Sequence, residues 1–245
     1  MLRYAITSRA LFRGEEAQKQ SALVAQCARW ATEGVDFIQL REKDLSPGAL
    51  AVLARSILQA IAQSTRSEID PEAAKIQGPK ARSIPAWGEA PGTEQREHER
   101  AESPTHSSPG TKLLINSRVD VAVATGAQGV HLTAAPSELT PTQIRQIYAA
   151  ANHPEPIITI SCHTIEEVRR AVSHKPDAIL FAPVFGKTVA GEAITPAAGL
   201  GKLREACTAA SPIPVYALGG VTQENAPSCI EAGARGIAGI RLFLG

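Results

Sequence analysis

Short β-branched segments alternate with amphipathic helical segments along most of the chain, and this alternation restricts the possible folds more than any other feature. Strands separated by helices pair in parallel through right-handed crossovers. Eight such units favour a closed (β/α)8 TIM barrel, an α/β fold, over an open doubly wound sheet. The eight expected strands are residues 3–7, 35–41, 112–116, 129–132, 157–162, 178–184, 214–218 and 236–240.

Several of the expected helices begin with a recognisable signal. Residues 46–47, 140–141 and 195–196 each place a Ser or Thr before a proline, which is favoured at the first helical position. Thr164 followed by Glu167 predicts a further helix start. No GxGxxG segment follows the first strand, which disfavours the dinucleotide-binding version of the open sheet.

Residues 64–110 interrupt the alternation. The segment carries six prolines among charged residues and serines, and neither the strand period nor the helix period survives there. We expect a flexible, disordered insertion after the second helix of a single barrel domain that spans residues 1–245. Residues 241–245 leave almost no room for an eighth helix, so the last helix is predicted to be truncated. Either a second subunit, in a homo-oligomer, or another segment of the chain would cover the side of the barrel left open.

Composition excludes several classes of function. A formal net charge of +1 predicts no general attraction to nucleic acid or to an anionic membrane. An aromatic content of 4% argues against stacking platforms for single strands. We expect a cytoplasmic protein, because no stretch approaches 18 apolar residues and no apolar core follows the first charges. Four separated cysteines indicate buried residues of a reducing compartment: Cys27, Cys162, Cys207 and Cys229.

The second expected strand ends in an unusual run of polar residues. The active site of such a barrel forms at the C-terminal ends of its strands. Gln39, Arg41 and Lys43 recur at a spacing of two, which on a continuous strand places them on one face. An arginine fork and a lysine charge suit phosphate groups. The alternative is a solvated strand end, in which Glu42 and Asp44 pair with the two cations.

Other strand ends add candidate residues. Asn116 and His131 end the third and fourth expected strands. Ser161 lies near the end of the fifth, and His163 directly follows it. His163 is a candidate proton shuttle near neutral pH. It is alternatively part of the helix cap at Thr164.

The last two strands and one loop supply candidates of a different kind. Gly219, Gly220 and Gly239 follow or end the last two strands, where bare backbone N–H groups can approach a phosphate. A tight turn is the alternative for Gly219 and Gly220. Residues 185–191, FGKTVAG, predict either a mobile lid that places Lys187 over an anion or an ordinary surface loop.

Together these segments resemble the thiamin phosphate synthase and thiazole tautomerase superfamily. The resemblance implies a TIM barrel and a transferase of thiamin biosynthesis. That enzyme would transfer a hydroxymethylpyrimidine group from its diphosphate to thiazole phosphate and release diphosphate. The resemblance is carried, in order, by YAIT, VDFIQLREKD, LLINSRVDVAVATGAQGVHL, ISCHTIEEVRRA, DAILFAPVF and VYALGGVTQENAPSCIEAGARGIAGI.

The resemblance also assigns roles to individual residues. Ser161 matches a serine near the pyrimidine, and His163 matches the acid/base residue of the tautomerase branch. The family's phosphate-binding lid is replaced in this chain, where Lys187 is the candidate for a substitute charge. The implied thiazole phosphate site lies at Gly219, Gly220, Gly239, Ile240 and Arg241. The residues implied to hold the pyrimidine diphosphate are Gln39, Arg41, Lys43 and Asn116.

The sequence departs from the family at its metal site. The resemblance implies Mg²⁺ for the synthase reaction, but Ser117 and Pro136 stand where the family has its two aspartate ligands, so no metal ligand is assigned. Glu138 and Asp120 are the candidates for a displaced ligand. Two alternatives stay open: a metal-independent thiazole tautomerase that uses His163 as its acid and base, and a non-catalytic protein that binds thiazole or thiamin phosphate.

Overall fold

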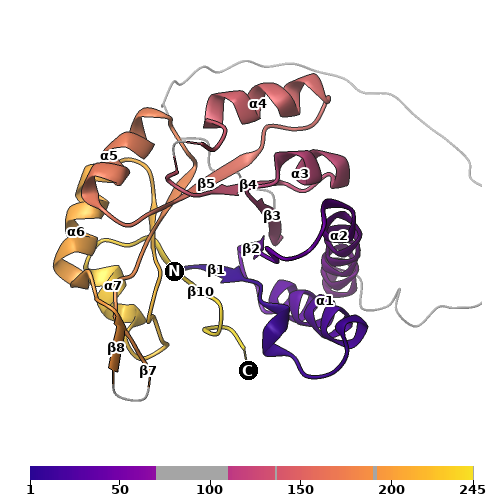
Figure 1. Cartoon of the computed structure of the whole chain (residues 1–245), viewed down its shortest axis with the longest axis horizontal. Coiled ribbons are helices and arrows are strands. Elements are labelled where there is room, and N and C mark those ends of the chain that lie inside the picture. The colour runs from indigo at the N-terminus through magenta and orange to yellow at the C-terminus, as the bar shows by residue number, and fades with distance from the viewer. Residues whose placement is uncertain (70–109, 136, 190–191, 245) are drawn as a thin grey trace, which may run out of the picture.

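The computed structural model describes residues 1–69, 110–135, 137–189 and 192–244. Within these ranges, eight parallel strands form a closed barrel in the order β1-β10-β9-β6-β5-β4-β3-β2, and the helices surround it (Figure 1). This confirms the predicted (β/α)8 barrel. The barrel strands are β1 (Leu2–Ile6), β2 (Phe37–Leu40), β3 (Lys112–Asn116), β4 (Gly129–Leu132), β5 (Ile157–Cys162), β6 (Ala178–Phe181), β9 (Val215–Ala217) and β10 (Gly236–Gly239).

Helices connect successive strands and cover the outside of the barrel. A short 3-10 helix, η1 (Arg9–Leu11), precedes the first α-helix. The α-helices are α1 (Glu16–Thr32), α2 (Pro47–Ile69), α3 (Val119–Thr125), α4 (Pro141–Ala150), α5 (Ile165–Ser173), α6 (Gly199–Ala210) and α7 (Ala226–Glu231).

Alternation along each strand divides the buried side chains into two layers. Ala5, Ile38 and Leu113 face outward and pack with the helices in one hydrophobic cluster. Tyr4 and Leu114, one residue away from outward-facing positions, belong to a second cluster inside the barrel. Because the inner face follows this period of two, Gln39 shares the inward face of β2 with Phe37.

Three of the four predicted helix starts are confirmed, and one is wrong. The hydroxyls of Ser46, Thr140 and Thr164 accept hydrogen bonds from backbone N–H groups of the first turns of α2, α4 and α5. Thr195 instead ends β8 (Glu192–Thr195), which pairs with β7 (Lys187–Val189) as an antiparallel hairpin. Helix α6 therefore begins only at Gly199. The predicted lid segment contributes β7, and its residues 190–191 lie outside the described ranges.

The insertion begins later than the sequence indicates. Helix α2 continues to Ile69, so residues 64–69, expected in the insertion, are helical. Residues 70–109, which make up most of the predicted insertion, lie outside the described ranges. The single-domain organisation over 1–245 therefore stays a prediction.

The end of the described chain packs against the first helix. No helix follows β10 up to Leu244, as the truncated last helix predicts. The indole N–H of Trp30, on α1, donates to the carbonyl oxygen of Phe243 at 2.7 Å. Trp30 is fully buried, so this contact ties the last turn of the chain to the helical layer beside β1. The homo-oligomer expected from the short end stays a prediction.

The predicted burial is confirmed for three of the four cysteines, and Cys207 is only half-buried. All four are free thiols, and Cys27, Cys162 and Cys229 are buried. Among the helices in the described ranges, none is long and apolar enough to cross a membrane.

We predict that Gly129→Ala destabilises the barrel by more than about 2 kcal/mol, because a buried overlap forces the strands apart. A Cβ at Gly129 would lie 1.9 Å from the carbonyl oxygen of Ile157 on the neighbouring strand. Gly48→Ala is the matched control, since a Cβ there meets nothing within 4 Å. It should leave stability unchanged or raise it by about 0.5–1 kcal/mol. Urea unfolding of both variants measures the difference; equal stabilities would contradict the close strand approach.

Candidate active site

A chain of hydrogen bonds crosses the C-terminal rim of the barrel from β2 to the loop after β4. The amide nitrogen of Gln39 donates to Asn116 Oδ1 at 2.8 Å. Asn116 Nδ2 donates to Ser117 Oγ at 3.2 Å, and Ser117 Oγ donates to Glu138 Oε1 at 2.7 Å. This series of hydrogen bonds ends at the Glu138 carboxylate, which accepts hydrogen bonds from several neighbouring groups. Gln39 Oε1, at the other end, is buried without a hydrogen-bond partner among the described residues.

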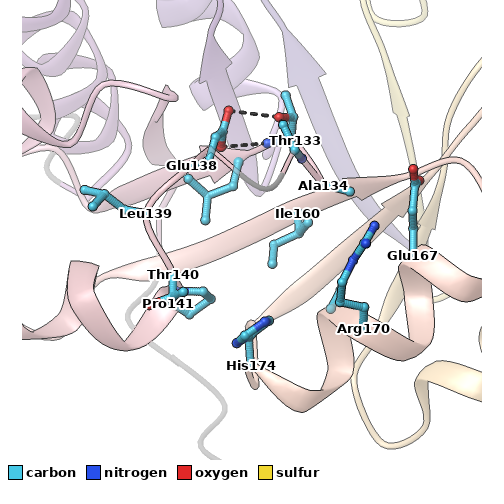
Figure 2. A pocket seen from close by; sticks show the side chains of 13 residues that line it. Thr133, Ala134, Glu138, Leu139, Thr140, Pro141, Ile160, Glu167, Arg170 and His174 are labelled. Atoms are coloured by element: carbon cyan, nitrogen blue, oxygen red, sulfur yellow. Dashed lines mark hydrogen bonds between the residues drawn. The ribbon is translucent and has the colours of Figure 1, made fainter.

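Glu138 is hydrogen-bonded to Ser117, one of the two positions where the family resemblance places an aspartate. It also accepts hydrogen bonds from the backbone N–H and the hydroxyl of Thr133, both at 2.9 Å (Figure 2). Ser117 itself adopts a left-handed backbone with φ of 55°. Pro136 lies outside the described ranges. Within those ranges, no group of three or more His, Cys, Asp or Glu side chains could hold a metal.

The other carboxylate considered from the sequence is already paired. Asp120 accepts a hydrogen bond from Arg118 Nε at 2.8 Å, and the second guanidinium nitrogen of Arg118 contacts its other oxygen. This hydrogen bonding is the main cause of a lowered pKa of Asp120. Between the two candidates, Glu138 is the one connected to the rim.

Arg41 and Lys43 follow β2 in the loop rather than on the strand. The strand ends at Leu40, which corrects the prediction that all three polar residues project from one continuous strand. The backbone N–H of Arg41 donates to Thr7 Oγ1 at 2.9 Å, which fixes the start of the loop. Arg41 is half-buried and Lys43 is exposed. Among the described residues, neither forms an ion pair.

The carboxylates beside these cations pair with a different arginine. Arg9 is buried and contacts Glu42 at 2.9 Å, Asp44 at 2.8 Å and Glu16. Glu42 is also buried and accepts a hydrogen bond from Thr7 Oγ1 at 2.7 Å. The solvated strand end, with Glu42 and Asp44 paired to the local cations, is therefore wrong.

Arg9 and its partners form an ion-pair cluster beside the candidate site that the sequence analysis missed. Hydrogen bonding to Asp44 is the main cause of the raised pKa of the Arg9 guanidinium, and the same bond lowers the pKa of Asp44. A signal was present, because Thr7 and Arg9 follow the first strand at the same spacing of two as the residues after β2. The consequence is that Arg41 and Lys43 keep their charges available at the rim.

A second polar network fills the barrel interior beneath the rim. His131 Nε2 lies 2.8 Å from Ser161 Oγ, and His131 Nδ1 lies 2.8 Å from Thr159 Oγ1. Tyr4 Oη lies 3.0 Å from Thr159 Oγ1 and 3.3 Å from His131 Nδ1. Burial, with a smaller contribution from the charge of Arg41, lowers the pKa of His131 to about 3. The imidazole is therefore neutral at physiological pH.

His163 lies outside this network, at the start of α5. Its backbone N–H donates to the Glu167 carboxylate at 2.6 Å, so it takes part in the helix cap, as the alternative interpretation states. Its Nδ1 donates to the carbonyl oxygen of Ala182 at 2.7 Å. Because a carbonyl oxygen only accepts, the neutral ring keeps Nε2 as an acceptor on an exposed side chain.

The glycines after β9 have a clear structural role. Gly219 and Gly220 adopt φ of 90° and 66°, in the left-handed region that favours glycine. An added Cβ would lie 2.7 Å from Pro183 at the first position and 2.7 Å from Phe185 at the second. The tight turn is therefore present. Within the described ranges, the two backbone N–H groups have no hydrogen-bond partner, so they are available to an anion.

Of the remaining predicted residues, three follow or end β10 next to this turn, and the side chain of the fourth is not described. Strands β9 and β10 are neighbours, which brings Gly239, Ile240 and Arg241 beside Gly219 and Gly220. Arg241 is exposed and Ile240 is half-buried. The side chain of Lys187 is outside the described part of the structure, so its place at the mouth stays a prediction.

A separate hollow lies beside the rim, between α4 and α5 (Figure 2). Arg170 and His174 lie on the α5 side, and Leu139 and Pro141 lie on the α4 side. Glu138 is the only residue of the candidate site that lines this hollow within the described ranges. We therefore place the candidate active site at the barrel mouth and not in this hollow.

Comparisons with known proteins bear on the family of this chain. The family described as thiamine monophosphate synthase matches residues 89–243. A thiamine-phosphate synthase of Methanoregula boonei is 30% identical over 223 residues, which cover 90% of this chain and 78% of that protein. A putative thiamine-phosphate synthase 2 of Aquifex aeolicus is 39% identical over 132 residues, 54% of this chain and 66% of that protein.

The match to several relatives is partial. The chain spans slightly less than two thirds of the length of the Aquifex protein and 57% of a putative thiamine-phosphate synthase of Geobacter sulfurreducens. Among solved structures, a thiamine phosphate pyrophosphorylase from Pyrococcus furiosus superposes with a TM-score of 0.64 at 21% identity. The superposition covers 98% of this chain and 85% of the Pyrococcus chain. At this identity the superposition supports the fold alone.

We predict that Arg9→Gln destabilises the protein by about 3–5 kcal/mol, because it leaves the Glu42 carboxylate buried without its cation. The double variant Arg9→Gln/Glu42→Gln should recover most of this loss. Arg118→Gln is the control, since its pair with Asp120 is more exposed and should contribute less than about 1 kcal/mol. Chemical denaturation tests all three. If Arg9→Gln cost no more than the control, the ion-pair cluster would not hold the two loops.

Proposed function

Because the chain belongs to the thiamine monophosphate synthase family, we propose that it is a transferase that forms thiamin phosphate. It moves a hydroxymethylpyrimidine group from its diphosphate to a thiazole phosphate. The bond between the pyrimidine methylene carbon and the diphosphate oxygen breaks, and its electron pair leaves with the diphosphate. The lone pair of the thiazole nitrogen then forms the new carbon–nitrogen bond.

The unpaired cations at the rim carry this proposal. Arg41 and Lys43 lie beside the Gln39–Asn116 pair, and Arg9 removes the local carboxylates that would otherwise neutralise them. A guanidinium grips two phosphate oxygens and an ammonium adds a point charge. These groups hold the diphosphate and stabilise the negative charge that it gains as the bond breaks.

The turn after β9 supports a second anion site on the opposite part of the rim. The backbone N–H groups of Gly219 and Gly220 are available there, and the end of β10 with Ile240 lies next to them. Phosphate sites of barrels commonly form after the seventh and eighth strands. We place the thiazole phosphate at this turn, so that its ring faces the pyrimidine across the mouth. Lys187 and Arg241 are proposed to add charge from the surrounding loops.

The oxygen donors at the rim fit a magnesium ion. Mg²⁺ is usually held by one or two carboxylates together with substrate phosphates and water. Glu138 supplies one carboxylate, and Ser117 and Asn116 are connected to it by hydrogen bonds. When bound, the ion would neutralise charge on the diphosphate and so assist its departure. The residues that would hold it are Glu138 and, through its hydroxyl, Ser117.

A metal-independent thiazole tautomerase is the second candidate, and His163 favours it. The hydrogen bond from Nδ1 to Ala182 leaves Nε2 as a basic acceptor on the C-terminal side of the barrel. Against this function, the complete set of Gln39, Arg41 and Lys43 is suited to a diphosphate that a tautomerase does not use. A non-catalytic binder of thiazole or thiamin phosphate differs from both by having no turnover.

We predict that Arg41→Met raises the KM for the pyrimidine diphosphate by about 10- to 100-fold, because a charged hydrogen bond contributes about 1.5–3 kcal/mol. Steady-state kinetics with both substrates measure the effect. Arg169→Gln, an exposed change on α5, serves as the matched control and should leave KM unchanged. An Arg41 variant with wild-type KM for the diphosphate would place the anion elsewhere and contradict the proposed site.

We predict that Glu138→Gln raises the magnesium concentration for half-maximal rate by at least about tenfold, since it removes the carboxylate at the rim. Asp120→Asn should have no such effect, because Asp120 is committed to Arg118. Ser117→Asp in the Glu138→Gln background should restore part of the magnesium affinity, as aspartate tolerates the left-handed backbone found there. Isothermal titration with Mg²⁺ provides a readout that does not depend on turnover. Identical magnesium affinities for wild type and Glu138→Gln would rule out this ligand.

A further inference from the structure

The buried network beneath the rim allows its proton positions to be counted. Among the described residues, the hydroxyl groups of Tyr4 and Thr159 contact only each other and His131 Nδ1. The other ring nitrogen, His131 Nε2, contacts Ser161 Oγ. The imidazole is neutral because burial lowers its pKa, so one of its nitrogens donates and the other accepts.

Only one tautomer satisfies every buried donor. With the proton on Nε2, Tyr4 donates to Thr159, Thr159 donates to Nδ1, and Nε2 donates to Ser161. With the proton on Nδ1, three protons compete for the two hydroxyl oxygens of Tyr4 and Thr159. Nδ1 no longer accepts in this form, and Tyr4 and Thr159 can share only one hydrogen bond between them. One of the two buried hydroxyl protons is therefore left without an acceptor. An unsatisfied buried donor disfavours a state by about tenfold or more.

We infer that the Tyr4–Thr159–His131 network fixes Ser161 as a hydrogen-bond donor toward the barrel mouth. His131 Nε2 occupies an acceptor position of the Ser161 oxygen, and the hydroxyl proton of Ser161 is left to point away from the ring. Tyr4, Thr159 and His131 are positioning residues, since they act through Ser161. Ser161 is half-buried at the rim, where its proton can reach a bound ligand.

The direction of the Ser161 hydroxyl proton indicates which group of a bound ligand it would contact. Arg41 follows Gln39 by two residues, and Gln39 is hydrogen-bonded to Asn116. Asn116 lies opposite His131 in the strand register, and His131 contacts Ser161. An anion held by Arg41 is therefore near Ser161, and a hydroxyl proton aimed into the mouth donates to it. This part rests on the proposed function and assigns Ser161 to the diphosphate group. A Ser161 that accepted from the ligand would instead present lone pairs to a negative charge, which is unfavourable.

The tautomer itself is the first test, and it needs no ligand or variant activity. Long-range ¹H–¹⁵N NMR of ¹⁵N-histidine protein distinguishes the two neutral tautomers, and the His131 signals are assigned by their loss in His131→Asn. We expect the Nε2–H form in the wild-type protein. Tyr4→Phe and Thr159→Val should each keep it, because the remaining hydroxyl still donates to Nδ1. The double variant leaves Nδ1 without a partner in either tautomer, so the preference imposed by the network is removed and the fraction of the Nδ1–H form should rise. A wild-type Nδ1–H tautomer would overturn the inference.

Binding of inorganic diphosphate tests the consequence for the ligand. We expect Ser161→Ala to weaken binding by about tenfold, because it removes a hydrogen bond to a charged acceptor. The double variant Tyr4→Phe/Thr159→Val should weaken it in the same direction, whereas the control Ser173→Ala on α5 should match the wild type. Equal affinities for Ser161→Ala and wild type would overturn the assignment of Ser161 to the diphosphate. Absence of binding in the wild type, together with the Nε2–H tautomer, would count against the proposed function and leave the proton positions supported.

Discussion

Parallel hydrogen bonding between β1 and β10 closes the sheet, and the site depends on this closure. It brings the C-terminal ends of all eight barrel strands to one rim. The inward side chains lower in the barrel, such as Leu114 and Tyr216, belong to one buried hydrophobic cluster. Above them, Thr159, His131 and Ser161 form a polar layer whose hydrogen bonds are made between strands. A ligand at the mouth would therefore meet polar groups whose positions are set by a rigid, closed sheet.

Electrostatic separation at the rim is the second determinant. The loops after β1 and β2 contain both cations and carboxylates within a few residues. Arg9 collects Glu42 and Asp44 into one ion-pair cluster, and Arg41 and Lys43 are left without carboxylate partners in the described ranges. Burying Glu42 without Arg9 would be costly, so the cluster also sets the relative position of these loops. One arginine thus stabilises the fold and maintains the local positive charge.

Much of the fold could be predicted from the sequence, because strand period and strand–helix alternation are local signals. The strand from 157 to 162 was predicted with the same limits as β5. The helix start at Thr195 was wrong because a Thr-Pro pair is compatible with a strand end as well as with a helix cap. The hairpin of β7 and β8 could not be foreseen, since three- and four-residue strands leave too short a pattern. The family resemblance is confirmed by the comparisons.

The sequence named many residues of the candidate site, but it did not predict most of the contacts between them. Gln39 and Asn116 were assigned to one site, and they are hydrogen-bonded. The partners of Glu42 depend on which loop lies beside it after the barrel closes, and no local pattern contains that information. The same holds for Glu138, which reaches Ser117 from 21 residues further along the chain.

The most direct measurement is to incubate the purified protein with hydroxymethylpyrimidine diphosphate, thiazole phosphate and magnesium, and to quantify thiamin phosphate. The account predicts product formation that requires both substrates and stops when a chelator removes the metal. A protein that binds thiazole phosphate in the presence of chelator but forms no thiamin phosphate would contradict it.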